Sequence, residues 1–360
     1  MGPEIKGGII NMKAAVLEEV GKLVVKEVEL PRVDSRGLLV KVESCAICGT
    51  DVKVYHYGHR LIHPPRITGH EVAGTIVEVG KEVKGYKVGD RVAVAPAVPC
   101  GQCYYCRRGI QSMCDNLTAI GYHYDGGFAE HMAVPPRAVE NACVNFIPPN
   151  ITTDEAALAE PLACAINGQE LSGVKLGDVV MIIGAGPMGC LHADLAKING
   201  ATKVIISEIS PARLELSKIS QADIFINSQK EDPIKRVMVE TEGRGAEVVI
   251  VACSSGLAQE QALQMVAKRG SINFFGGLPK DHSIIRFDSN LPHYREFQVV
   301  GTHGSAPRHN WLALDLIGSG KINAKKYITH RLLVEKLLEG LAMVERGEGL
   351  KIIIKPTHKE

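Results

Sequence analysis

The stretch "DVVMIIGAGPMG", residues 178–189, decides the fold of this chain. Its uninterrupted apolar run predicts a buried strand, and the glycine-rich letters that follow predict a tight turn. Apolar residues at helical spacing continue over residues 187–200 and end on a glycine. A strand, a glycine-rich turn and a helix in this order are typical of proteins that bind dinucleotides.

Each glycine of "GAGPMG" has a separate role in this strand–turn–helix unit. Gly184 makes the tight turn, Gly186 lets a pyrophosphate approach the backbone, and Gly189 lets the helix pack closely on the strand. The phosphates would lie at the N-terminus of the helix, beside Pro187 and Met188, where unpaired N–H groups favour negative charge. The alternative is a glycine turn in an α/β protein that binds no nucleotide.

The next predicted strand ends on a carboxylate. Glu208 lies 19 residues beyond Gly189, close to the spacing of an acid that binds the ribose hydroxyls of an adenosine. Because this carboxylate would repel a 2′-phosphate, NAD is favoured over NADP. Arg213 is open to two interpretations, a contact beside the adenine or tolerance of a phosphate.

Hydrophobic patterning divides the chain. Short alternating runs in the first half predict antiparallel strands, and a helix is expected over residues 152–171. Strands and helices then alternate, including a helix over residues 256–269, which predicts a doubly wound parallel sheet. After about residue 300 strands and helices no longer alternate, and the sequence predicts an amphipathic helix followed by a terminal strand.

The segment "PCGQCYYCRRGIQSMC", residues 99–114, carries cysteines with the spacing C-x2-C-x2-C-x7-C. Zinc takes four thiolates in a closed tetrahedron at structural sites, which leaves no position for a substrate. A four-cysteine iron–sulfur centre and four unliganded thiols are the alternatives. The cysteines of this set are Cys100, Cys103, Cys106 and Cys114.

A second set of candidate ligands is dispersed along the chain. "CAICGTD" supplies Cys48, "ITGHEVAG" supplies His70 and Glu71, and "LAEPLACAING" supplies Glu160. Mixed sulfur, nitrogen and oxygen donors suit a catalytic zinc, which keeps one position exchangeable. Glu71 is interpreted either as a ligand or as a partner of a ligand, and Cys45 as a buried thiol.

Taken in chain order, these motifs resemble the zinc-dependent medium-chain alcohol dehydrogenase superfamily over nearly the whole chain. The resemblance rests on "CAICGTD", "GHEVAGTIVEVG", "VGDRVAV", the four-cysteine segment, "DGGFAEH", "AEPLACAI" and "GAGPMG". "GHE" together with "EPL" resembles the polyol and threonine dehydrogenase branches. Glu160 stands where the simple alcohol dehydrogenases have a second cysteine ligand.

The resemblance implies an α/β protein of two domains. A GroES-like, mostly-β catalytic domain would consist of residues 1–165 and 301–360, with a structural zinc lobe at about residues 96–116. A Rossmann domain of residues 166–300 would bind NAD as a doubly wound parallel sheet.

The resemblance also implies two zinc ions per chain. Cys48, His70 and Glu71 would hold the catalytic ion, with Glu160 as an alternating or water-mediated ligand, and the four-cysteine segment would hold the structural ion. Thr50 matches the residue that passes the substrate proton onward.

One position departs from the family pattern. Histidine usually follows three residues after Thr50, but this chain has Lys53, a poorer proton acceptor near neutral pH. His56 and His59 are nearby in sequence as alternative acceptors.

The predicted reaction is the oxidation of a secondary alcohol of the polyol or sugar-alcohol type to a ketone, with NAD as hydride acceptor. L-threonine 3-dehydrogenase and a sugar-phosphate alcohol dehydrogenase are the alternatives. Tyr122 and His123 are candidate pocket residues, and Arg308 either binds an anionic substrate group or points into solvent.

Composition and charge argue against several other classes of protein. A net charge of +1 over 360 residues argues against a nucleic-acid partner, and no apolar run is long enough to cross a membrane. Residues 1–11 lack the apolar core of a secretory signal, so a cytoplasmic protein is expected. The expected partners are a small alcohol and further copies of the chain, as a homotetramer or homodimer. A zinc-ribbon binding module and a zinc-free reductase or non-catalytic relative remain the competing classes.

Overall fold

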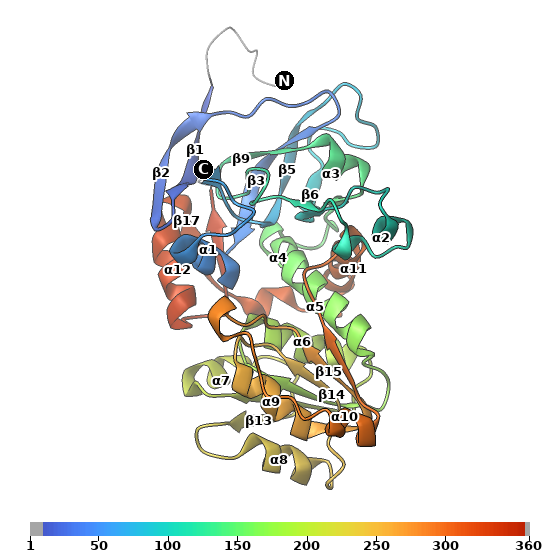
Figure 1. Cartoon of the computed structure of the whole chain (residues 1–360). Helices are drawn as coiled ribbons and strands as arrows, with labels where there is room; N and C mark the ends of the chain where they lie inside the picture. The colour runs from blue at the N-terminus through green and yellow to red at the C-terminus, as the bar shows by residue number, and fades with distance from the viewer. Residues whose placement is uncertain (1–9, 357–360) are drawn as a thin grey trace.

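The computed structural model describes residues 10–356, so most of the segment expected to precede the fold lies outside the described residues. Figure 1 shows two halves stacked one above the other, with a strand-rich half at the top and an α/β half at the bottom. The two ends of the described chain both lie in the strand-rich half. No helix among residues 10–356 has the length and apolar character needed to span a bilayer.

The lower half is built on six parallel strands in the order β13-β12-β11-β14-β15-β16. The chain reverses direction across the sheet between β11 and β14, which is where open α/β sheets bind ligands. The strands are β11 (Val179–Ile183), β12 (Lys203–Glu208), β13 (Ile224–Asn227), β14 (Ala246–Val251), β15 (Val266–Phe274) and β16 (Gln298–Gly301). The doubly wound parallel sheet expected from the sequence is therefore present.

Helices pack against both faces of this sheet, which is why its strands read as unbroken apolar runs. In β11, Val179, Met181 and Ile183 join one buried cluster, while Val180 and Ile182 join the cluster on the opposite face. The helices of this half are α6 (Pro187–Ile198), α7 (Pro211–Ser217), α8 (Pro233–Glu240), α9 (Gly256–Met265) and α10 (Asn290–Arg295).

The upper half contains a larger sheet in the order β10-β6-β5-β3-β18-β17, with β9 also paired to β3, and a smaller sheet in the order β2-β1-β4. Short β7 and β8 pair with each other. The bounds are β1 (Asn11–Glu19), β2 (Lys22–Glu29), β3 (Leu38–Ala46), β4 (Arg66–Ile67), β5 (Glu71–Val79), β6 (Arg91–Val94), β7 (Ala97–Val98), β8 (Thr118–Ala119), β9 (His131–Val134), β10 (Val144–Phe146), β17 (Ile328–Leu333) and β18 (Lys351–Lys355).

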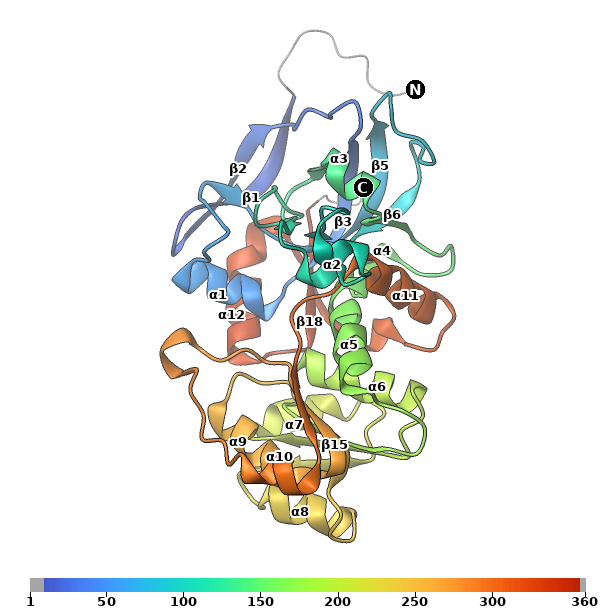
Figure 2. The same cartoon turned by 45° about the vertical axis from the view of Figure 1, so that its right-hand side comes forward.

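The end of the chain returns to complete the upper sheet. β18 pairs antiparallel with β3 and parallel with β17. Figure 2 shows β18 near the middle of the molecule, above the parallel sheet. The remaining helices are α1 (Gly49–Tyr57), α2 (Tyr104–Arg107), α3 (Pro136–Glu140), α4 (Thr153–Ala157), α5 (Ala159–Ser172), α11 (Pro307–Gly318) and α12 (Leu337–Arg346).

Two helices differ from the sequence expectation. The helix expected over residues 152–171 is two helices, α4 and α5, which meet at Leu158. The helix expected over residues 256–269 ends at Met265, because the chain from Val266 onward pairs with β14 as β15. The pairing partners lie outside this segment, so its own helical spacing did not reveal the change.

Candidate active site and metal centres

Cys48 stands at the junction of a strand and a helix in the upper half. It follows β3 and is the N-cap residue of α1, with extended backbone angles. Its backbone N–H donates a 2.9 Å hydrogen bond to Oδ2 of Asp51 in the first turn of the helix. This local bond fixes the turn that carries the thiol.

His70 and Glu71 come from the neighbouring strand. Glu71 is the first residue of β5, which pairs with β3 so that Glu71 lies opposite Ala46. Both side chains are buried, and one ligand atom from each lies within 4.8 Å of the others and of the Cys48 sulfur. The sheet register therefore brings together three of the predicted ligands.

Asp51 orients the histidine, and sequence reasoning gave it no role. Its Oδ1 lies 3.6 Å from Nδ1 of His70, while its Oδ2 holds the Cys48 backbone. A carboxylate behind a histidine fixes which ring nitrogen faces a metal and raises its basicity. The signal was present in the motif "CAICGTD", whose final letter is this residue.

Glu160 approaches the same place from α5. It is not part of the 4.8 Å set, and its Oε1 accepts a 3.5 Å hydrogen bond from the thiol of Cys164 one turn later. Burial raises the pKa of Glu71 to about 7, with Lys351 opposing this rise and the charge of Glu160 adding to it. Glu160 is thus an electrostatic neighbour of Glu71.

The chemistry of this donor set fits a zinc ion. A thiol, an imidazole and a carboxylate are the donors that zinc takes at catalytic sites, at about 2.0–2.3 Å from the ion. Ligand atoms around one such ion must lie within roughly 4 Å of each other, which a set gathered within 4.8 Å approaches. The role of each residue as a ligand remains a prediction.

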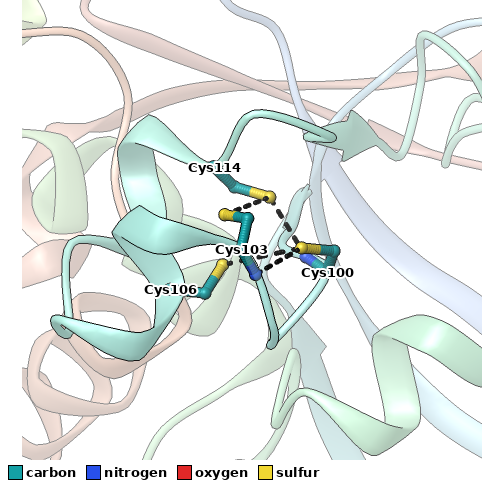
Figure 3. Close-up of side chains that lie close together, drawn as sticks. All are labelled: Cys100, Cys103, Cys106 and Cys114. Atoms are coloured by element: carbon teal, nitrogen blue, oxygen red, sulfur yellow. Dashed lines mark hydrogen bonds between the residues drawn. The ribbon is translucent and has the colours of Figure 1, made fainter.

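The four-cysteine segment forms a separate compact loop around α2 (Figure 3). Sulfur atoms of Cys100 and Cys106 lie 4.0 Å apart, and those of Cys103 and Cys114 lie 3.9 Å apart. Thiolates at tetrahedral positions about 2.3 Å from one zinc would be about 3.8 Å apart. The thiols are not joined as disulfides, so the arrangement fits a closed metal site.

Backbone groups in this loop favour the thiolate form of Cys100. The N–H groups of Gln102 and Cys103 point at the sulfur of Cys100, and the bond from Gln102 is the largest effect that lowers the pKa of Cys100 to about 6. A lowered pKa favours the thiolate, which is the form that binds metal.

The glycine turn of the lower half has the expected close contacts. Gly184 has a φ of 111°, a conformation that favours glycine, and a Cβ on Gly189 would lie 1.9 Å from the carbonyl oxygen of Gly184. Gly186 is the N-cap of α6, and Pro187 and Met188 occupy its first turn. The turn therefore presents the N-terminus of α6 at the carboxyl end of β11.

Glu208 ends β12 beside that turn. Its Oε2 accepts the backbone N–H of Ala185 within "GAGPMG", and its Oε1 accepts the N–H groups of Ile209 and Ser210, each at 2.9 Å. These bonds tie the acid to the glycine turn.

Arg213 reaches toward the upper half. A Cβ added to Gly347, at the end of α12, would lie 2.3 Å from its Nε. The guanidinium therefore lies against the C-terminus of a helix of the other half, and neither of the two interpretations drawn from the sequence is tested.

A hydrogen bond joins the two halves of the molecule near the candidate sites. Lys53 on α1, five residues after Cys48, donates from Nζ to Oγ of Ser254 at 3.3 Å. Ser254 follows β14, at the edge of the sheet where the chain direction reverses. The helix that begins at Cys48 thus faces the edge where a dinucleotide is expected.

The predicted pocket residues separate into two groups. The Tyr122 ring lies 5.7 Å from that of His70 and 5.1 Å from that of His59, measured between centroids. His123 instead accepts the backbone N–H of Ala119. Arg308 forms a two-pronged ion pair with Glu170, with hydrogen bonds of 3.0 and 2.5 Å, so its charge is already neutralised.

Known proteins resemble this chain over most of its length. A family model for the alcohol dehydrogenase GroES-like domain matches residues 34–143, and one for zinc-binding dehydrogenases matches residues 187–318. L-threonine 3-dehydrogenase of Pyrococcus abyssi is 38% identical over 332 residues, which cover 91% of this chain and 93% of that protein. Sorbitol dehydrogenase of Halalkalibacterium halodurans is 30% identical over 350 residues, 96% and 99% of the two chains.

A solved protein of Sinorhizobium meliloti with bound NADP has the same fold, with a TM-score of 0.89 and 32% identity over 96% of this chain and 100% of that one. The matches define an oxidoreductase of the zinc-binding class. The chain belongs to the zinc-dependent medium-chain alcohol dehydrogenase superfamily, which confirms the resemblance drawn from its motifs and the fold class that it implied.

Proposed function

We propose that this protein oxidises a secondary alcohol of the polyol or sugar-alcohol type to a ketone and reduces NAD. One observation carries the proposal: the helix that follows Cys48 reaches, through Lys53 and Ser254, the strand edge beside "GAGPMG". This contact supports a donor set for zinc and a site for a dinucleotide that lie on facing sides of the two halves, as direct hydride transfer requires.

The reaction divides between the two sites. A zinc ion held by Cys48, His70 and Glu71 would supply Lewis acidity that lowers the pKa of a substrate hydroxyl. Thr50, in the first turn of α1, would accept the proton that leaves the substrate oxygen and pass its own proton onward to solvent. A dinucleotide held by "GAGPMG" and Glu208 of the lower half would supply the hydride acceptor, so that loss of a proton and a hydride would leave the substrate as a ketone.

NAD is the proposed acceptor because of Glu208. Its carboxylate is held by three backbone N–H groups at the end of β12, where a 2′-phosphate would meet its negative charge. The solved relative with bound NADP makes the choice of dinucleotide a necessary part of the test.

A polyol is the proposed substrate because two side chains with polar atoms lie in a row next to the metal donor set. Tyr122 and His59 form a continuous line of rings from His70 outward, and their hydroxyl and ring nitrogens suit a chain of hydroxyl groups. The similarity to sorbitol dehydrogenase supports this choice. L-threonine is the second candidate, supported by the 38% identity to a threonine 3-dehydrogenase.

A panel of alcohols tests the proposal. Reduction of NAD would be followed by absorbance with polyols, L-threonine and sugar-alcohol phosphates, each repeated with NADP. We expect the highest kcat/KM with a polyol and NAD. A preference for L-threonine would select the second candidate, and no reduction with any alcohol would overturn the proposed function.

Arg308 provides a matched control within the same panel. Because Glu170 already binds its guanidinium, Arg308→Gln is expected to keep the substrate ranking of the unaltered protein. Loss of activity toward only the phosphorylated alcohols would instead assign Arg308 to an anionic substrate group.

A further inference from the structure

A buried lysine lies directly beside the candidate catalytic metal site. Lys351 begins β18 and is only 3% exposed. Its ammonium group forms an ion pair with Oε2 of Glu71 and donates a 3.1 Å hydrogen bond to the carbonyl oxygen of Ile47. Cys48 and Glu160 also lie within electrostatic range of its charge.

Packing alone does not explain a lysine at this position. The next three residues of β18 are isoleucines that are fully buried, and an apolar side chain would continue that pattern. A charge removed from water is unfavourable unless another charge compensates it. The compensating charge here is Glu71, so the lysine and the carboxylate must be considered as one unit.

A metal bound at this site would give Glu71 two competing positive partners. Its carboxylate belongs to the donor set with Cys48 and His70, yet Lys351 already holds one of its oxygens. The other acid of the site is held in a similar way, because the thiol of Cys164 donates to Glu160. Each carboxylate therefore has a partner within the protein besides the metal.

We propose that Lys351 is a positioning residue that competes with the metal for Glu71. When the site holds no metal, the lysine neutralises a carboxylate that would otherwise be buried without a counter-charge. When the site is loaded, the lysine limits how strongly Glu71 binds the ion, which leaves a coordination position for the alcohol. This inference rests on the proposed function only for the presence of a metal at Cys48, His70 and Glu71.

Zinc binding to Lys351→Met tests the inference without any substrate. The protein would keep the zinc of its four-cysteine loop, and the second site would be titrated with zinc against a competing chelator. We expect the variant to bind this zinc at least about tenfold more tightly, the size of effect that partners of metal ligands have. We also expect zinc to raise the melting temperature of the variant by more than that of the unaltered protein, because only the metal-free form loses its counter-charge.

Two further variants separate positioning from simple stability. Lys355→Met alters another lysine of β18, whose partner Asp154 is not part of the metal set, so it should lower the melting temperature equally with and without zinc. Lys351→Arg keeps the charge and should bind zinc with nearly unchanged affinity, which also guards against a Lys351→Met protein that fails to fold. Unchanged zinc affinity in Lys351→Met, with equal melting shifts in both forms, would overturn the inference.

The zinc-binding test of Lys351 can be decided even if the proposed function fails. In Cys48→Ala the second zinc should be lost, which would show that the titrated site is the one that Lys351 adjoins. If the unaltered protein binds zinc there but oxidises no alcohol, the proposed function fails while the inference about Lys351 can still be decided.

Discussion

Asp51 is the side chain that links two candidate ligands. One of its oxygens holds the backbone of Cys48 and the other faces Nδ1 of His70. Because an amide presents one oxygen and no charge, Asp51→Asn is expected to weaken zinc binding at this site about 10- to 100-fold. A zinc titration against a competing chelator would measure the change.

The control for Asp51 is a residue of α12 that contacts the same helix, α1. His56 of α1 contacts Glu345, so Glu345→Gln disturbs α1 without touching the metal set, and its zinc affinity should match that of the unaltered protein. An Asp51→Asn protein with unaltered affinity would show that the carboxylate has no orienting role.

The choice of dinucleotide is predicted to depend on Glu208. Glu208→Gln removes the negative charge beside the expected ribose while keeping a side chain of similar size, so the ratio of kcat/KM for NADP to that for NAD should rise. Glu215→Gln is a suitable control, because Glu215 pairs with Lys218 on α7 and is exposed. Rates measured in parallel with NAD and NADP would give this ratio of kcat/KM values. An unchanged ratio in Glu208→Gln would show that the charge of Glu208 does not set the choice of dinucleotide.

Among individual residues, the sequence motifs predicted the candidate zinc ligands better than the side chains that hold those ligands in place. Cys48, His70 and Glu71 were recognisable because the motifs that contain them resemble those of the zinc-dependent alcohol dehydrogenases, and the structure brings their ligand atoms together. Lys351 lies 280 residues from Glu71 in sequence, and only the fold shows that the two meet. Its one local signal was a charge at the start of an apolar strand, in "LKIIIKP".

Asp154 joins four elements of the upper half. It accepts hydrogen bonds from Ser44 of β3, Lys355 of β18 and Arg331 of β17, while it lies itself on α4. Burial alone would raise the pKa of Asp154, but these hydrogen bonds, led by that of Lys355, outweigh burial and hold the pKa below its usual value. The ionised form is therefore favoured by folding.

The consequence is a pH dependence of stability with a defined sign. Because the folded pKa of Asp154 is lowered, its contribution is present above the unfolded pKa and is lost as the pH falls through the folded value, below about pH 4. Asp154→Asn is expected to reduce the free energy of unfolding by about 2 kcal/mol near neutral pH, less than for a fully buried pair because Arg331 is half exposed. Urea unfolding over a range of pH should show the difference between variant and unaltered protein shrinking in acid.

The four-cysteine loop is predicted to stabilise the upper half and not to react. Cys103→Ser should reduce the zinc content from two ions per chain to one and lower the melting temperature, while dinucleotide binding by the lower half persists. Cys143→Ser is the control, because Cys143 is buried outside both metal sets. A zinc content that stays at two would contradict the assignment of the loop.

For the whole molecule, local patterns predicted the kinds of element but not how distant segments pair. The apolar run of β11 and its glycine turn indicated the parallel sheet, because both sides of that strand are buried. The pairing of β18 with β3 joins segments about 300 residues apart, and no local pattern encodes it. The number of subunits stays a prediction.

The central claim is that chemistry occurs at the dispersed donor set and not at the four-cysteine loop. The turnover of Cys48→Ala, with NAD and the best alcohol of the unaltered protein, tests this claim most directly when dinucleotide binding is measured on the same sample. We predict that turnover is lost while NAD still binds, because Cys48 lies in the upper half and "GAGPMG" lies in the lower half. Turnover that survives the loss of this thiol would contradict the account.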